Sequence, residues 1–185
     1  AGYGAAVAGA GDVDGDGYGD LIVGAPGHDN GEADEGIARL YRGGPSGPAT
    51  IPAWTAEGNE SGAAFGSAAA TAGDVNGDGY ADVVVGSPGF GAGQGRAVLY
   101  LGGPAGLATT PAWVFAPTGT GAQVGAAVAA AGDVNGDGYS DVIVGAWQFS
   151  DPGTLEVEGR AFVFLGSSAG LATSPAWTGE GNQAD

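Results

Sequence analysis

The sequence predicts an all-β fold, a β-propeller assembled from four-stranded antiparallel blades, with three blade equivalents in its 185 residues. Three observations lead to this prediction. An aspartate-rich segment occurs three times, beginning at residues 11, 73 and 132. Each copy is followed by short runs of β-branched and aromatic residues, and these runs are bounded by Gly and Pro. Four short strands in roughly 60 residues, repeated along the chain, is the pattern of a propeller blade.

The four candidate strands of each repeat follow in chain order. The first is a run of small residues ahead of the aspartate-rich segment, at residues 3–12, 65–74 and 124–133. The second is the apolar run directly after that segment. The third is an alternating aromatic and branched run, and the fourth surrounds the sequence PAW; together they span residues 37–54, 96–113 and 160–177. Small residues suit a crowded place, so we expect the first strand of each blade to lie innermost, around the propeller axis.

The aspartate-rich segments, residues 11–26, 73–88 and 132–147, place oxygen-bearing side chains at positions 1, 3, 5 and 9 of each loop. Carboxylates at that spacing repel one another, so the segment makes physical sense around a hard cation. Glycine at the sixth position permits a sharp turn, and the backbone carbonyl at the seventh offers a further oxygen, as in other calcium loops. We predict three Ca²⁺ per chain. Their ligands are Asp12, Asp14, Asp16, Tyr18 and Asp20; Asp74, Asn76, Asp78, Tyr80 and Asp82; and Asp133, Asn135, Asp137, Tyr139 and Asp141.

Calcium is favoured over magnesium because Mg²⁺ retains water and prefers a strict octahedron. An EF-hand requires a glutamate at position 12 of the loop, where this chain has Val23, Val85 and Val144 inside strand-like runs. The loop therefore leads into a strand rather than a helix. The alternative is a set of Asp, Asn and Gly turns in an acidic protein that binds no ion.

The composition restricts both partners and chemistry. The 21 acidic residues outnumber the 4 basic ones, and the formal net charge is -17. This charge argues against nucleic acid and anionic membranes as partners, and no run of 18 apolar residues is present that could insert into a membrane. The absence of Cys excludes disulfides, zinc–thiolate sites and thiol catalysis. A single His leaves little material for a nucleophilic triad.

Two further short motifs complete each repeat. An aromatic–glycine pair precedes the loop, as Tyr3-Gly4 and Phe65-Gly66, and is degraded to Val124-Gly125 in the third copy. The sequence Gly-Ala-Pro follows the loop at residues 24–26, and becomes Gly-Ser-Pro at 86–88 and Gly-Ala-Trp at 145–147. This combination resembles the FG-GAP repeat of integrin α-subunit propellers and their bacterial and fungal relatives, over essentially the whole chain. The resemblance implies a calcium-binding propeller used for adhesion or ligand recognition, in a family whose complete members usually have seven blades.

Three blades do not close a ring, because propellers use about four to eight. The repeat units span approximately residues 1–55, 56–114 and 115–178, and residues 178–185 joined to residues 1–10 match the start of a unit. We therefore expect a whole number of repeats, cut in mid-unit. We expect two identical chains to associate head to tail into a six-blade ring, in which the tail of each chain completes a blade of the other. The alternative is a piece of a longer array whose other segments complete the ring.

A ligand is expected on the face opposite the calcium loops. In an up-and-down blade the calcium loops share a face with the turns between third and fourth strands. The irregular loops at residues 26–36, 88–95 and 147–159 lie on the other face, and variable loops on a repeating scaffold usually carry recognition. The candidate ligand contacts are Trp147, Phe149, His28 and Phe90. For Trp147, packing against a neighbouring blade is an equal alternative, whereas Trp54, Trp113 and Trp177 recur once per repeat and are expected in the core.

These expectations combine into a non-catalytic recognition module, secreted or at the cell surface where calcium is abundant, that binds a carbohydrate or protein ligand. One alternative is a structural repeat segment of a larger surface or adhesion protein, with no ligand of its own. Another is a carboxylate-dependent enzyme acting on polysaccharides, because acids outside the loops, such as Glu32 and Asp151, could form a pair. None of those acids shows a spacing that demands catalysis, so we predict no enzyme.

Overall fold

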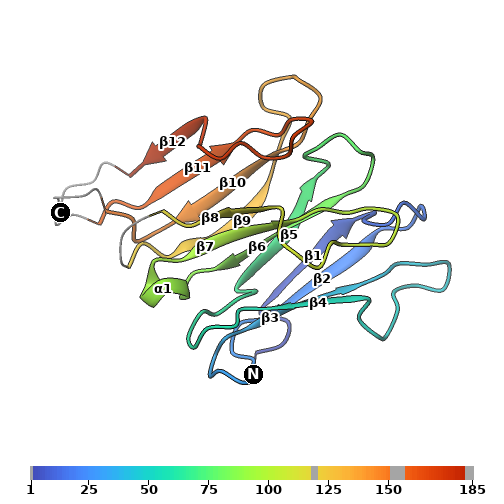
Figure 1. Cartoon of the computed structure of the whole chain (residues 1–185), viewed down its shortest axis with the longest axis horizontal. Helices are drawn as coiled ribbons and strands as arrows, with labels where there is room; N and C mark the ends of the chain where they lie inside the picture. Colours follow the sequence, from blue (N-terminus) through green and yellow to red (C-terminus); the bar gives the residue numbers. More distant parts are fainter. Residues whose placement is uncertain (1, 118–120, 151–156, 182–185) are drawn as a thin grey trace.

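The computed structural model describes residues 2–117, 121–150 and 157–181. These residues form three four-stranded antiparallel sheets, each made of four strands consecutive in the chain (Figure 1). The first sheet contains β1 (Ala6–Gly11), β2 (Asp20–Ala25), β3 (Ile37–Tyr41) and β4 (Trp54–Glu57). The second contains β5 (Ala68–Gly73), β6 (Asp82–Ser87), β7 (Arg96–Tyr100) and β8 (Trp113–Phe115). The third contains β9 (Val124–Gly132), β10 (Asp141–Ala146), β11 (Arg160–Phe164) and β12 (Trp177–Glu180).

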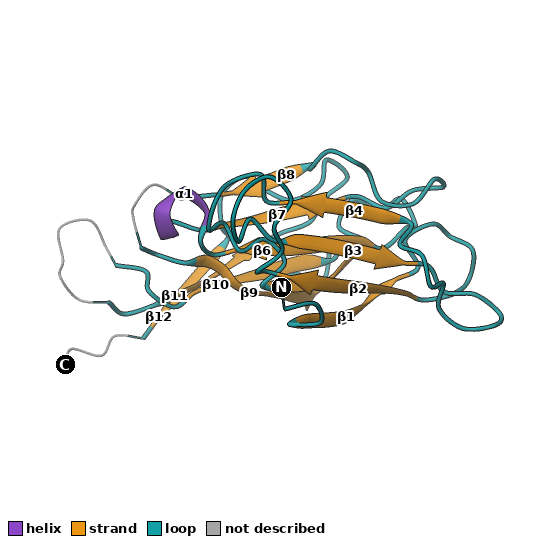
Figure 2. Cartoon of the chain, turned by 90° about the horizontal axis from the view of Figure 1, so that it is seen from below, coloured by secondary structure: helices purple, strands orange, loops and turns teal. Residues whose placement is uncertain are grey.

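The predicted all-β architecture is confirmed, because each sheet has the up-and-down order of a propeller blade. The connections between strands gather at the two ends of the sheets (Figure 2). The one element that the sequence did not predict is α1 (Phe90–Gly93), a four-residue helical turn in the loop between β6 and β7. Two of its residues, Gly91 and Ala92, have left-handed backbone angles, with φ of 61° and 58°. It is therefore a tight turn of small residues rather than a regular helix.

The first strand of each sheet lies toward the centre of the fan of sheets, as predicted. β5 contacts both β1 and β9, so the three small-residue strands lie side by side (Figure 1). Larger side chains at these positions would hold the sheets apart. The Ala- and Gly-rich composition, which favours helix by propensity alone, is thus explained by close approach of the sheets.

Two apolar cores lie between the sheets, one at each junction. The strand β6 supplies both, because its side chains alternate between its two faces: Val83 and Val85 belong to the core shared with the first sheet, and Val84 to the core shared with the third. All six residues of β6 are buried, whereas β2 alternates with exposed positions because only one of its faces is covered. The middle sheet is therefore packed as a blade inside a ring, and the outer sheets are each packed on one face.

A tryptophan side chain stabilises each of the two junctions between sheets. Trp54 donates its Nε1–H to the carbonyl of Ala108 in the next sheet at 2.9 Å, and its ring meets the ring of Tyr100 edge-on. Trp113 makes the same bond to Ala172 at 3.0 Å. The prediction of core packing is confirmed for these two. It is wrong for Trp177, which is 55% exposed because no described residues cover the corresponding face of the third sheet.

Glycine is required where β2 and β6 approach the next sheet. A Cβ added at Gly24 would lie 2.0 Å from the carbonyl oxygen of Gly66, and one at Gly86 would lie 1.8 Å from that of Gly125. The Gly of Gly-Ala-Pro and the Gly of the aromatic–glycine pair therefore meet across each junction. This contact gives the two short motifs a shared physical role.

The fourth strands end a few residues beyond the predicted unit boundaries at 55, 114 and 178, at Glu57, Phe115 and Glu180. Each sheet nevertheless draws all its strands from one repeat, and the division of the chain into units stays a prediction. No helix in the described part of the chain is long and apolar enough to cross a bilayer.

We predict that Gly86→Ala destabilises the fold by about 2–3 kcal/mol or more, because the new methyl group would overlap backbone that cannot move without opening the junction. Gly103→Ala is the matched control, since a Cβ there meets nothing within 4 Å. Denaturant unfolding of both variants measures the difference. Equal stability of the two would contradict the close approach of the second and third sheets.

Candidate metal centres

Each aspartate-rich segment forms the hairpin loop between the first two strands of its sheet. The loop backbone curls around the carboxylate of the first aspartate, which accepts hydrogen bonds from several backbone N–H groups. Asp12 Oδ1 accepts the N–H of Gly15 at 2.8 Å and of Asp16 at 3.1 Å, and Oδ2 accepts that of Gly17 at 2.8 Å. Asp74 and Asp133 repeat the arrangement. The glycine at the sixth position has φ of 89° to 92° in the three loops, which other residues rarely adopt.

The aspartate at the ninth position ties the loop to the rest of its sheet. Asp20 accepts the N–H of Val13 at 2.9 Å and, across the sheet, the N–H of Gly43 at 2.8 Å. Asp82 and Asp141 make the same pairs of bonds, to Val75 and Gly102 and to Val134 and Gly166. All three carboxylates are buried. They hold the loop beside the turn between third and fourth strands, which confirms that these connections share one face.

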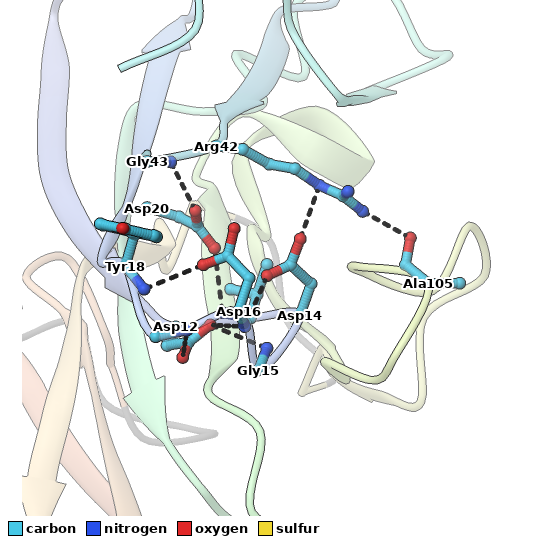
Figure 3. A network of polar contacts seen from close by, with 11 residues as sticks. Asp12, Asp14, Gly15, Asp16, Tyr18, Asp20, Arg42, Gly43 and Ala105 are labelled. Atoms are coloured by element: carbon cyan, nitrogen blue, oxygen red, sulfur yellow. Dashed lines mark hydrogen bonds and ion pairs between the residues drawn. The ribbon is translucent and has the colours of Figure 1, made fainter. Parts of the chain in front are cut away.

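The first loop brings three predicted ligands together. Oxygens of Asp12, Asp14 and Asp20 lie within 4.8 Å of one another (Figure 3). The fourth predicted side chain, Asp16, lies outside this group, and its Oδ1 accepts the N–H of Tyr18 at 2.9 Å. Within the described ranges this is the one group of three or more carboxylate, imidazole or thiolate ligands that converges in this way.

The second and third loops have an asparagine at the third position, which changes the local hydrogen bonding. Asn76 accepts the N–H of Asp78 and donates its Nδ2–H to the Asp78 carboxylate at 2.9 Å. Asn135 does the same to Asp137, with the Nδ2 contact at 2.8 Å. The second and third loops therefore carry three carboxylates each, with a hydrogen bond from the asparagine side-chain amide to one of them. The first loop carries four carboxylates.

The extra carboxylate of the first loop has its own counter-charge. Asp14 Oδ2 lies 2.9 Å from Arg42 Nε, and the Asp14 side chain is only 6% exposed. The Nε–H lacks hydrogen-bond geometry, so the contact is an ion pair rather than a hydrogen bond. Arg42 also donates from Nη2 to the carbonyl of Ala105 in the second sheet at 2.9 Å, and thereby links loop and junction (Figure 3). Leu101 and Leu165 occupy the position of Arg42 in the other repeats.

Sequence reasoning missed this pair. The signal was present, because Asp at the third loop position occurs in the one repeat that has Arg directly after its third strand. Where the loop has Asn, Leu follows the third strand. The pairing keeps the net charge around each of the three loops equal.

Hydrogen bonding, burial and neighbouring charge shift the pKa values of three loop aspartates. Backbone N–H groups, that of Gly17 foremost, lower the pKa of Asp12, and Asp133 is lowered in the same way by Gly138. Burial, together with the negative charges of Asp78 and Asp74, raises the pKa of Asp82 to about 6. A cation placed among these groups would favour their ionised forms. The all-oxygen donor set and the convergence at the first loop fit a hard divalent ion.

The candidate ligand residues on the opposite loops do not form one site. Phe90 lies under the guanidinium of Arg96, at 3.9 Å from the ring centroid, and Phe149 lies under Arg160 at 4.3 Å. His28 is half-buried in the corresponding loop of the first sheet. Trp147, 60% exposed, donates its Nε1–H to Gln123 Oε1 at 3.0 Å. These four residues come from three different sheets.

A groove of about 690 Å³ runs between the first and second sheets near one of these loops. Of the four candidates, Phe90 lines it, together with Arg96, Glu57 and Asn59. The groove was not predicted, because it arises where two repeats meet rather than within one.

Comparison with known proteins identifies the same three repeats. The model of the family described as "FG-GAP repeat" matches residues 3–41, 65–100 and 124–164. Integrin alpha-IIb of Mus musculus is 40% identical over 144 residues, which cover 74% of this chain and 14% of the relative. Integrin alpha-PS2 of Drosophila melanogaster is 38% identical over 153 residues, covering 74% and 11%. Integrin alpha-5 of Xenopus laevis is 33% identical over 174 residues, covering 89% and 16%. The chain thus spans 11 to 16% of the length of these relatives.

The Asp14–Arg42 pair yields a prediction for the cation-free protein. Arg42→Leu leaves Asp14 nearly buried without its counter-charge and removes the bond to Ala105, so in chelator it should lower the free energy of unfolding by about 0.5–1 kcal/mol. Adding Asp14→Asn recreates the Asn and Leu of the other repeats and should recover most of that loss. Denaturant unfolding of the two single variants and the double variant measures the coupling. Strictly additive effects would show that the two side chains do not interact.

Proposed function

Because the chain belongs to the FG-GAP repeat family, we propose that it is a non-catalytic, calcium-binding β-propeller segment that recognises a carbohydrate or protein ligand outside the cell or at its surface. The observation that carries the proposal is the convergence of Asp12, Asp14 and Asp20 in a loop that recurs twice more along the chain. These three carboxylates face one side-chain cation, Arg42, so a bound metal ion would compensate the remaining negative charge.

The proposed sites hold three Ca²⁺ per chain, one in each hairpin loop. The ligands would be the side chains at positions 1, 3, 5 and 9 and the backbone carbonyl at position 7: Asp12, Asp14, Asp16, Asp20 and Tyr18, with the corresponding residues at 74–82 and 133–141. Calcium tolerates the irregular geometry and the variable Asp or Asn at the third position. Its role would be structural, because it neutralises the carboxylates and holds the loop beside the neighbouring turn.

Recognition would then use the face opposite the calcium loops. The groove beside Phe90 offers a cation, a carboxylate and an amide from Arg96, Glu57 and Asn59, a polar lining suited to sugar hydroxyls or a peptide backbone. The matched relatives are named integrin alpha subunits, and the family resemblance implies adhesion. This supports a surface or secreted location and a protein or carbohydrate partner.

The proposal includes further blades beside the three of this chain, since propellers use about four to eight. A second copy of the chain is the proposed source of those blades, and segments of a longer array are the alternative. A structural repeat segment of a larger surface protein, without a ligand of its own, is the second candidate function. It is favoured by the small share of the relatives' length that this chain spans. Glycan-array and protein-binding measurements with and without chelator separate the two, since the structural segment would bind in neither condition.

The calcium sites are tested by Asp78→Ala. Asp78 is exposed, and its carboxylate accepts only hydrogen bonds within its own loop, from Asn76 Nδ2 and the N–H of Tyr80. In chelator its loss should therefore lower the melting temperature less than it does in calcium. In calcium the variant should melt at a lower temperature than the unmodified protein. One of the three sites loses a ligand, so the bound ion stabilises the folded state less. Calorimetric melting of both proteins in both conditions is the measurement. An equal difference with and without calcium would contradict the assignment of the cage.

Arg42 should moderate the first site. With Arg42→Leu, four carboxylates face the ion without a competing cation, so calcium affinity at one of the three sites should rise several-fold and become more sensitive to salt. Titration calorimetry at two ionic strengths measures this. Lower affinity in the variant would mean that Arg42 assists cation binding by positioning Asp14 rather than opposing it by charge.

A further inference from the structure

We propose that the groove between the first and second sheets binds an extended protein segment in which an aromatic and an acidic residue stand two positions apart. The aromatic ring enters the apolar part of the groove, and the carboxylate pairs with Arg96. This inference rests on the proposed function, because it names the class of ligand that the recognition groove takes. It uses the contacts of the first junction only.

The apolar part of the groove is explained by a difference between the two junctions. Phe115 of β8 fills the second junction, where its ring centroid lies 5.0 Å from that of Phe162 and 4.7 Å from that of Phe164. At the first junction Ala56 of β4 stands at the position of Phe115, and Val98 at that of Phe162. Both small residues line the groove of about 690 Å³. The groove therefore includes the place that an aromatic ring takes in the second junction.

Arg96 brings a positive charge to the same groove without a carboxylate partner. It donates from Nη2 to the carbonyl of Gly58 at 3.0 Å, while its buried Nε–H makes no hydrogen bond. No ion pair joins Arg96 to any residue that the structure describes. Its counterpart Arg160 pairs with Glu180, an acid that the second repeat lacks. The guanidinium of Arg96 thus keeps donors for the carboxylate of a ligand.

Tyr100 adds a hydroxyl to the lining. The side chain is only 5% exposed, and its hydroxyl makes no hydrogen bond with the described residues. Phe164, its counterpart in the third repeat, has no hydroxyl to satisfy. A tyrosine hydroxyl that is nearly buried usually has a hydrogen-bond partner, and the backbone of a bound segment supplies one. Burial raises the pKa of Tyr100, so the hydroxyl remains a donor at neutral pH.

The spacing of these groups identifies the ligand as an extended segment. Arg96, Val98 and Tyr100 alternate along β7 and all line the groove. Successive members of this row are two residues apart, about 6.6 Å along the strand. Side chains two positions apart in an extended peptide also lie on one side at that distance. A ring beside Val98 and a carboxylate at Arg96 therefore match one such step.

The protein's own carboxylates near the groove are bonded to other groups. Both oxygens of Glu57 accept hydrogen bonds from Asn30 Nδ2, at 2.9 and 3.0 Å. Glu60 accepts the N–H of Gly91 at 2.8 Å. These acids therefore leave the Arg96 guanidinium available to a carboxylate from outside.

An acidic sugar is the competing ligand, because its carboxylate could also pair with Arg96. Its hydroxyls, however, would lie without partners against Ala56 and Val98, which costs free energy. A phenyl ring would instead repeat the packing that Phe115 has in the second junction. The lining therefore favours a protein segment over a carbohydrate.

A synthetic heptapeptide tests the inference. The sequence GEGFGEG, acetylated and amidated, presents a phenylalanine with a glutamate two positions away in either direction. Titrated into the isotope-labelled whole chain in calcium, it should shift the NMR signals of the β4 and β7 amides. Peptides with Gln for both Glu, or with Ala for Phe, should bind about ten-fold more weakly or worse.

Two variants alter the groove with side chains that the chain already uses elsewhere. Ala56→Phe places a ring where Phe115 lies in the second junction, so the folded protein should bind the heptapeptide at least ten-fold more weakly. Tyr100→Phe recreates Phe164 and removes only the hydroxyl, so affinity should fall a few-fold. Thermal melting of both variants checks that they fold.

A matched pair of arginine variants tests the charge. Arg96→Gln should weaken heptapeptide binding about ten-fold or more, because a charge-assisted bond is lost. Arg39→Gln removes an arginine from β3 that does not line the groove, and should leave the affinity unchanged. Equal effects of the two substitutions would contradict the pairing with Arg96.

Absence of heptapeptide binding, equal binding of its Gln or Ala form, or binding that survives Ala56→Phe would overturn the inference. Glucuronic acid that binds in the groove more tightly than the heptapeptide would also overturn it, but would leave the proposed function in place with a carbohydrate ligand. Specific binding of the heptapeptide by a chain that takes up no calcium would uphold the inference and reject the proposed cation sites.

Discussion

The structure depends on the buried carboxylate at the ninth position of each hairpin loop. Asp20, Asp82 and Asp141 each accept one N–H from their own loop and one from the turn after the third strand. A buried carboxylate with two charge-assisted bonds fixes both segments at once. It also brings negative charge close to the remaining loop aspartates, so the bond that organises each sheet creates the electrostatic problem that a cation would resolve.

The same loops govern how sheets meet. Carbonyls of the loop accept hydrogen bonds from the next sheet, and the tyrosine of the next loop packs on a loop glycine. The conformation of one loop therefore helps to fix the conformation of the next. Arg42 extends this in the first repeat, where it contacts Asp14 on one side and Ala105 in the second sheet on the other. Loop, turn and junction are thus parts of one polar layer on one face, and the apolar cores lie beneath it.

Much of this could be predicted from the sequence, because repetition exposes the pattern. The four strands per repeat, the innermost small-residue strand, the loop positions and the core role of Trp54 and Trp113 follow from recurrence and period. Contacts between repeats could not be predicted in that way. The Arg42–Asp14 pair, the groove beside Phe90 and the exposure of Trp177 depend on how neighbouring sheets sit, and Asp16 lies outside the converging group because its carboxylate instead caps the turn at Tyr18.

We propose that each hairpin loop encloses one calcium ion. Diffraction from crystals grown in calcium, recorded at a wavelength where calcium scatters anomalously, tests it most directly. Bound calcium should give one anomalous peak in each of the three loops, surrounded by the oxygens of positions 1, 3, 5, 7 and 9. Loops that keep their fold with no peak inside them would contradict it and leave the aspartates as turn-forming residues alone.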